Sequence, residues 1–321
     1  MTNDTIFAPS IVTNDTIFAP SIVTNDTIFL CRDILTWLSQ YGILNGKEWF
    51  FLIKEQHLEI WDKTVRKNND LIQKSRYSLT VQEHKVILYL IAHIDPWDEE
   101  LKTMEFDIQT FCRTCGIEET NGGNYKNLKD TIRGLREKSI GWIDVDDDET
   151  LIGWIERPFI NKGKGIVRIR LDEYLQPYLL RLRKNFTQYE LIYTLKFRSR
   201  YTFRLYELVQ SRFFNKLEPY VFRYNVDKLK NLIDADTYTE YRDFKRRALV
   251  PAVNEICEYS DTNLKFEEIK QGRKVKEVEF TISVKPPMER IKIKSRIEKE
   301  LGTSQMTLFD LLKEKGEVNE N

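Results

Sequence analysis

The order of helical and strand-like segments occurs twice along this 321-residue chain, and this repetition limits the folds that the chain can adopt. Residues 64–185 contain helical runs, then strand-like runs, then a further helix, and residues 186–286 follow the same order. The chain is long enough for two ordinary domains, and its 41% hydrophobic residues can bury a sizeable core. We therefore predict an α+β protein with two similar domains in tandem.

A helix with a basic edge is predicted at residues 124–138 of the first segment. Its apolar residues recur at spacings of three and four, which puts them on one side of a helix: Tyr125, Leu128, Ile132 and Leu135. Basic residues repeat this spacing one position later: Lys126, Lys129, Arg133 and Arg136. These cations are candidates for DNA contacts, and the alternative is an ordinary solvated helix surface.

The strand-like runs after this helix predict a β-hairpin from residues 140–145 and 151–156, with a third strand at 165–171. An earlier helix opens with a capping box, in which Thr80 is followed three residues later by Glu83. Helices followed by such a hairpin are typical of the winged-helix domain, a variant of the helix-turn-helix. The hairpin tip at residues 144–149 is acidic, so we expect DNA phosphates to repel this wing.

Cations outnumber acids at the start of the second segment. Glu190 is the one acid in residues 181–204, which hold these cations: Arg181, Arg183, Lys184, Lys196, Arg198, Arg200 and Arg204. The aromatic residues interleaved with them favour a buried core rather than base stacking. We predict phosphate contacts from Arg198, Arg200 and Arg204.

The recognition helix of the second segment is predicted at residues 240–258, where apolar residues four apart define the buried side. The following basic and amide residues are the candidates for DNA contacts: Arg242, Lys245, Arg246, Arg247 and Asn254. Arginine can donate two hydrogen bonds to guanine, and asparagine can form two with adenine. A proline at position 251 should bend or split the helix. A second hairpin follows, and its tip offers Arg273 and Lys274 to the backbone or the minor groove.

The composition argues against several other classes of protein. Lys+Arg and Asp+Glu both number 50, which argues mildly against nucleic-acid binding until the local clusters above are considered. No signal peptide or membrane span is evident, so we expect a cytoplasmic protein. The lone Cys112–Cys115 CxxC pair favours buried thiols over a zinc site. No phosphate-binding loop and no His-x-His pair for metal-dependent nicking is present, so we predict no cofactor, no metal and no enzymatic activity.

The two ends of the chain differ from its middle. An 11-residue sequence is repeated without change at positions 2–12 and 13–23, and we expect residues 1–29 to form a poorly ordered arm before a helical extension at 30–63. A charged tail spans residues 287–321. It contains a segment that resembles the pentapeptide by which proteins bind the bacterial sliding clamp: Gln305, Met306, Leu308 and Phe309. The alternative is a short helix docked on the protein's own surface.

The chain resembles the two-winged-helix initiators of iteron-controlled, theta-replicating plasmids. The resemblance rests on Asn69–Ile72 with Tyr77–Glu83, then on Arg200–Leu208, Phe244–Ile256 and the Gly272–Val275 turn, in this order. It implies a replication initiator that binds directly repeated origin DNA as a monomer, chiefly through the domain at 186–286. It also implies a dimer, formed through the domain at 64–185, that represses its own gene, and recruitment of the host initiator and replicative helicase. The alternatives are a winged-helix repressor and, with less support, a rolling-circle nicking initiator.

Overall fold

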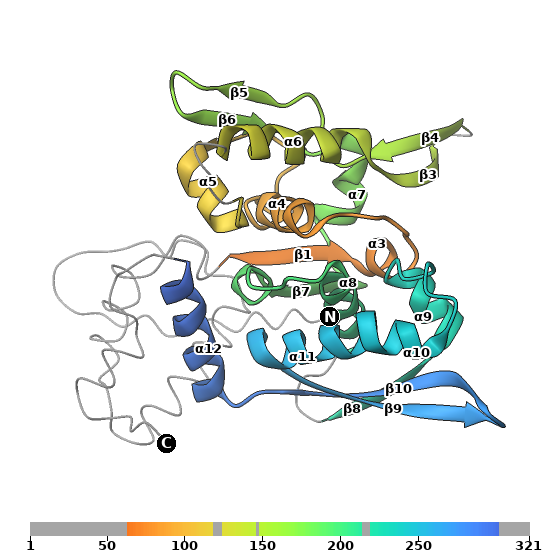
Figure 1. Ribbon diagram of the computed structural model, residues 1–321. Helices are drawn as coiled ribbons and strands as arrows, with labels where there is room; N and C mark the ends of the chain where they lie inside the picture. The colour runs from red at the N-terminus through yellow and green to blue at the C-terminus, as the bar shows by residue number, and fades with distance from the viewer. Residues whose placement is uncertain (1–62, 118–123, 146–147, 214–218, 302–321) are drawn as a thin grey trace, which may run out of the picture. The chain divides into compact units, whose positions relative to one another are not determined.

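A computed structural model describes residues 63–117, 124–145, 148–213 and 219–301 (Figure 1). The predicted arm at 1–29 lies outside the described residues. So do the extension at 30–63, apart from its last residue, and the Gln305–Phe309 segment. The elements of the first part of the chain are β1 Thr64–Asn68, α3 Asn69–Gln73, α4 Val81–Ala92, β2 Met104–Asp107, α5 Ile108–Cys115, α6 Asn124–Glu137, β3 Ser139–Val145, β4 Asp148–Gly153, β5 Phe159–Asn161, β6 Ile166–Ile169, the 3₁₀ turn η1 Glu173–Leu175 and α7 Gln176–Leu179. Those of the second part are β7 Phe186–Glu190, the 3₁₀ turn η2 Leu191–Thr194, α8 Arg200–Gln210, β8 Tyr220–Asn225, α9 Val226–Leu232, α10 Tyr241–Phe244, the π-helical turn η3 Lys245–Leu249, α11 Val250–Tyr259, β9 Thr262–Gln271, β10 Lys274–Val284 and α12 Pro287–Glu300.

The two halves share one topology. In the first, α4 is followed by β2, α5 and α6, and an antiparallel sheet then forms in the order β2-β6-β5. In the second, α8 is followed by β8, α9 and the α10–α11 helix, and the sheet has the order β8-β10-β9. Asp107 caps α5 directly after β2, and Asn225 caps α9 directly after β8. Each half therefore has the helix, strand, helix, helix and hairpin order of a winged helix.

The wing of the first domain is not the hairpin that its sequence pattern indicates. Strands β3 and β4 do form a hairpin, but they make a separate two-stranded sheet. The predicted third strand, β6, pairs with β2 and β5 instead of with that hairpin. The hairpin β5–β6 is therefore the wing, and β3–β4 is an insertion between the recognition helix and the wing.

The two domains meet at a short sheet and a buried ionic cluster. Strand β1 pairs antiparallel with β7, so the first strand of one half and the first strand of the other lie side by side. Behind them the carboxylate of Glu207 accepts hydrogen bonds from Lys67 Nζ at 2.5 Å and from the Tyr189 hydroxyl at 2.6 Å. Lys67 and Glu207 are each 1% exposed. We call Lys67, Tyr77, Tyr189, Arg204 and Glu207 the ionic cluster.

His84 lies in the same buried region, and its titration makes stability depend on pH. Its ring stacks on Phe203 with centroids 4.8 Å apart, and its Nδ1 lies 3.0 Å from the carbonyl oxygen of Thr80. Burial lowers the pKa of His84 to about 3. An unfolded histidine binds a proton below about 6.5, so in this window the unfolded state takes up a proton that the folded state does not.

We therefore expect the folded protein to lose stability as the pH falls below about 6.5, by up to about 1.4 kcal/mol per pH unit from this residue. Urea unfolding between pH 7 and pH 5 measures the slope. A His84→Gln variant should show a shallower slope, because glutamine does not titrate. Equal slopes for the two proteins would contradict the assignment.

Candidate nucleic-acid interface

Helix α6 carries the predicted basic stripe on its exposed side. Leu128, Ile132 and Leu135 are buried against the first domain's core, as the spacing predicts. The four cations of the stripe are exposed: Lys126, Lys129, Arg133 and Arg136. The chain folds this way because three-four spacing separates an apolar stripe from a polar one on a helix. Their contact with DNA remains a prediction.

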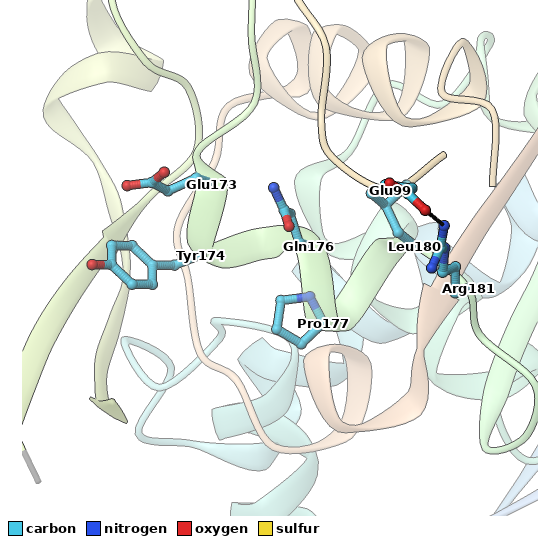
Figure 2. A pocket seen from close by; sticks show the side chains of 7 residues that line it. All are labelled: Glu99, Glu173, Tyr174, Gln176, Pro177, Leu180 and Arg181. Carbon is cyan, nitrogen blue, oxygen red and sulfur yellow. Dashed lines mark hydrogen bonds and ion pairs between the residues drawn. The ribbon is translucent and has the colours of Figure 1, made fainter. Parts of the chain in front are cut away.

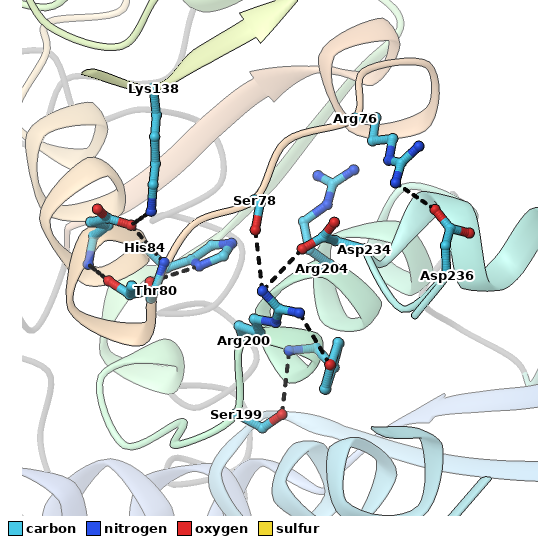
Figure 3. A network of polar contacts seen from close by, with 12 residues as sticks. Arg76, Ser78, Thr80, His84, Lys138, Ser199, Arg200, Arg204, Asp234 and Asp236 are labelled. Carbon is cyan, nitrogen blue, oxygen red and sulfur yellow. Dashed lines mark hydrogen bonds and ion pairs between the residues drawn. The ribbon is translucent and has the colours of Figure 1, made fainter. Parts of the chain in front are cut away.

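Contacts with α4 fix the place of α6 in the domain. Thr80 and Glu83 form the predicted capping box, with Thr80 N donating to Glu83 Oε2 at 2.6 Å. Lys138, just after α6, donates to the same carboxylate at 2.5 Å (Figure 3). A Cβ at Gly134 would lie only 2.3 Å from Glu83 Oε1, so glycine at this position allows α4 and α6 to approach closely.

The tip of the β5–β6 wing adds lysines to this basic surface. Lys162 and Lys164 are exposed in the turn between the strands, and Gly165 adopts a left-handed φ of 67° that favours glycine. The ammonium groups of Lys162 and Lys129 lie 5.5 Å and 4.8 Å from the centre of the Tyr125 ring. Tyr125 thus joins the wing tip to the recognition helix through cation–π contacts.

The sequence pattern indicated an acidic hairpin as the wing of the first domain and not β5–β6. Residues 144–149 belong to the β3–β4 insertion, and residues 146–147 lie outside the described part of the chain. The assignment of this acidic hairpin as the first wing is therefore wrong, because β5–β6 is the wing and its tip carries lysines. Contact of either hairpin with DNA remains a prediction. In the sequence, this wing is indicated by Lys162 and Lys164, which stand between two short runs of alternating residues.

Removing both lysines tests the wing. We expect Lys162→Ala with Lys164→Ala to weaken binding to every DNA sequence by a similar factor. The slope of log affinity against log salt concentration should become shallower by roughly two, which corresponds to two lost phosphate contacts. The reason is that phosphate contacts carry no sequence information. Salt-dependent mobility shifts measure this effect. An unchanged slope would show that the wing lysines do not contact DNA phosphates.

The recognition helix of the second domain runs from α10 through η3 to α11. Arg242, Arg246, Arg247 and Asn254 are all exposed on it. Their contact with bases remains a prediction. Pro251 does not split the helix. Instead, the π-helical turn Lys245–Leu249 stands before it and changes the local pitch where the arginines project.

The helix and the second wing are tied together. Lys245 forms an ion pair with Glu268 of β9 at 2.7 Å, and the Tyr241 hydroxyl donates to the same carboxylate at 3.1 Å. Beyond this tie, β9 and β10 close in a tight turn at Gly272, whose φ is 64°. Arg273 and Lys274 are exposed at this tip, as predicted. Each domain therefore presents a basic helix together with a basic wing tip.

Known protein families match both halves. The family described as "Initiator Replication protein, WH1" matches residues 64–210, and the one described as "Initiator Rep protein, WH2" matches residues 225–282. The chain belongs to the initiator replication protein family. The predicted resemblance and the prediction of two tandem winged-helix domains are thereby confirmed.

Individual relatives of this initiator agree with the family match. A replication initiation protein of Escherichia coli is 24% identical over 224 residues, which cover 68% of this chain and 69% of the relative. The crystal structure of the Pi initiator protein in complex with iteron DNA has a TM-score of 0.56 at 21% identity. The structural alignment covers 70% of this chain and 98% of the Pi initiator chain. This likeness shows a common fold.

The first family match extends beyond the predicted end of the first domain. It includes β7 and α8, whereas the sequence places the boundary between residues 185 and 186. Since β7 pairs with β1 and α8 occupies the place of a first helix in the second half, this segment serves both halves. The predicted boundaries remain proposals.

The prediction that Arg204 contacts DNA is wrong. The residue is 2% exposed, and its guanidinium donates to the carbonyl oxygens of Ile72, Ser75 and Leu232 and to the Tyr77 hydroxyl. Arg204 ends the basic run at residues 181–204, and its ionic partner Glu207 lies three residues beyond that run. Arg204 holds α8 against α9 of the second domain and against the segment before α4 of the first.

Arg200 and Arg198 differ from Arg204. Arg200 is 36% exposed and lies between the halves, donating to the Ser78 hydroxyl at 3.1 Å and pairing with Asp234 at 3.2 Å (Figure 3). Arg76 pairs with Asp236 beside it at 2.6 Å. These pairs give Arg200 a role between the domains, and its phosphate contact remains a prediction. Arg198 is exposed, and its contact with DNA likewise remains a prediction.

An open cleft of about 580 Å³ lies between the loop before β2 and the η1–α7 segment (Figure 2). Its lining residues are Glu99, Glu173, Tyr174, Gln176, Pro177, Leu180 and Arg181. Arg181 pairs with Glu99 at 2.8 Å, and the lining contains neither a histidine nor a cysteine.

Other chemistry is not assembled in the described ranges. No group of three or more His, Cys, Asp or Glu residues there could hold a metal ion. Cys112 and Cys115 are buried, and burial raises the pKa of Cys112 to about 11, as for a structural thiol. Among the helices of those ranges, none has both the length and the apolar character to cross a bilayer.

Proposed function

We propose that this initiator starts theta-type plasmid replication by binding directly repeated origin DNA, the iterons, with both winged-helix domains. One observation supports this most strongly: the two halves present equivalent surfaces, each with a basic helix and a basic wing tip. An α-helix fits into the major groove of DNA, and a wing beside it can lie along the neighbouring DNA backbone. The structural relative, the Pi initiator protein, was crystallised in complex with iteron DNA, which agrees with this proposal.

Within this proposal the basic surfaces of the two domains make different kinds of contact with DNA. Arg242, Arg246, Arg247 and Asn254 read bases, because arginine and asparagine can form paired hydrogen bonds with guanine and adenine. Lys126, Lys129, Arg133 and Arg136 bind phosphates and fix the register of the first domain. The protein then acts through binding energy, by bending or straining the origin and recruiting the host initiator and the replicative helicase. This proposal requires no catalytic residue, metal or cofactor.

A mobility-shift titration tests the proposal. Full-length protein is titrated against a duplex carrying the plasmid's repeats and against a scrambled duplex, at 50 to about 200 mM salt. We expect at least a roughly 1,000-fold preference for the repeats, with affinity falling as salt rises. Equal affinity for both duplexes in a folded sample would rule the proposal out.

Repression of its own gene by a dimer is a second part of the proposal, and it comes from the family resemblance. The dimer forms through the first domain, whereas the monomer binds the repeats. An experiment can separate initiation from repression. The test plasmid carries the repeats but no initiator gene, and the protein is expressed from a second plasmid. Replication of the test plasmid supports initiation, and repression without replication supports the plain-repressor alternative.

The Gln305–Phe309 segment is proposed to bind the sliding clamp. Met306, Leu308 and Phe309 would enter an apolar pocket while Gln305 fixes the register through hydrogen bonds. We expect Leu308→Ala with Phe309→Ala to abolish pull-down of purified clamp and to leave binding to the repeats unchanged. Undiminished pull-down would refute the assignment.

A further inference from the structure

Helix α12 lies beyond both family matches, the second of which ends at residue 282. Ile291, Ile293 and Ile297 are buried, so the helix is docked on the protein rather than solvated. Its position is notable because α12 contacts both α11, the recognition helix, and η2, the turn that follows β7 (Figure 1).

On one side, cations from α12 and the residues before it cap the end of the recognition helix. The last carbonyl groups of a helix lack partners within the helix and carry partial negative charge. Lys285 donates from Nζ to the carbonyl oxygen of Cys257, and Arg296 donates to that of Glu258 at 2.6 Å. The guanidinium of Arg296 also lies 5.2 Å from the centre of the Tyr259 ring. The C-terminal turn of α11 is therefore held by two positive charges.

On the other side, ion pairs attach α12 to the junction between the domains. Lys294 is 7% exposed and pairs with Glu190, the last residue of β7, whose side chain is 14% exposed. Lys196, after η2, pairs with Glu300 at 2.9 Å. Strand β7 is in turn paired with β1, so this anchor continues into the first domain's sheet.

We propose that α12 is a brace that fixes the direction of the recognition helix relative to the domain junction, with Lys294 and Glu190 as its positioning residues. The inference rests on the proposed function, since a fixed direction matters when two domains bind one duplex in a single register. A recognition helix held at its C-terminal end projects Arg242, Arg246 and Asn254 at a constant angle. Misalignment of such groups by about 1 Å removes much of their benefit.

The test uses the full-length chain and three variants. Lys294→Glu sets two carboxylates against each other in the buried pair, and Glu190→Lys with Lys294→Glu restores opposite charges. Lys74→Glu makes the same charge change at an exposed position outside α12. Hydrogen exchange over residues 190–194 and 253–259 reports docking without DNA, and mobility shifts report affinity for the repeats.

We expect Lys294→Glu to speed exchange in both segments and to weaken binding roughly tenfold, and the charge-swapped pair to recover most of both effects. The Lys74→Glu control should match the wild type in both measurements. Wild-type exchange rates in Lys294→Glu, or no recovery in the swapped pair, would overturn the brace. If the wild type itself does not prefer the repeats, the proposed function fails, and exchange alone decides whether α12 braces α11.

Discussion

Replacing Arg242 and Arg246 together with alanine is expected to lower affinity for the repeats by at least roughly 30-fold. Each arginine that pairs with a base contributes about 1–3 kcal/mol, and both side chains are exposed on the recognition helix. Arg246 pairs with Asp243 at 2.9 Å, a surface ion pair of small energy that DNA contacts can replace. Affinity for a scrambled duplex should fall much less, so the preference for the repeats should shrink.

A matched control separates base reading from the loss of positive charge. Lys74 and Lys102 are exposed lysines outside both recognition helices and both wings, and replacing them with alanine removes the same two charges. We expect this variant to bind the repeats within a few-fold of wild-type affinity. If the lysine variant lost as much affinity as the arginine variant, the assigned recognition helix would be wrong.

Replacing Glu207 with glutamine is expected to destabilise the folded protein by about 3–5 kcal/mol, because it leaves Lys67 buried without a negative charge. Burial alone would raise the pKa of Glu207, but the charges of Lys67 and Arg204 dominate and lower it to about 2. The folded-state pKa is thus below the unfolded value. The stabilisation is present above the unfolded pKa of about 4.3 and is lost as the pH falls toward 2.

Urea unfolding at pH 7 measures this effect, with a surface ion pair as control. Glu279 pairs with Arg223 at 2.5 Å, and Arg223 is 56% exposed. Glu279→Gln should therefore cost no more than about 1 kcal/mol. If Glu207→Gln cost no more than this control, the ionic cluster would not hold the domains together. At low pH the difference between wild type and Glu207→Gln should narrow, since the wild-type carboxylate then becomes protonated.

Features with a local cause could be predicted from the sequence. The spacing of Leu128, Ile132 and Leu135 predicted α6 and its buried side because a helix places such residues on one stripe. The capping box at Thr80 and Glu83 marked the start of α4 because both of its hydrogen bonds join residues three apart. The exposed arginines of the second recognition helix followed from the same periodicity.

Features that depend on distant partners could not be predicted in this way. Alternating residues indicate a strand but not its neighbour, so β3–β4 was assigned as the wing although β6 pairs with β2, which is more than fifty residues earlier. Arg204 counted as a surface cation because its partners in the folded chain, among them Ile72 and Leu232, lie far away in sequence. The docking of α12 likewise depends on Glu190, which is about a hundred residues before it.

Hydroxyl-radical footprinting of full-length protein on a single repeat tests most directly whether both domains bind one duplex. Two protected patches are predicted, about one helical turn of 10 base pairs apart. The Lys162→Ala/Lys164→Ala variant should weaken protection in one patch, and Arg242→Ala/Arg246→Ala should abolish the other patch together with most of the affinity. A single patch that is insensitive to the wing lysines would contradict the claim and assign DNA binding to the second domain alone.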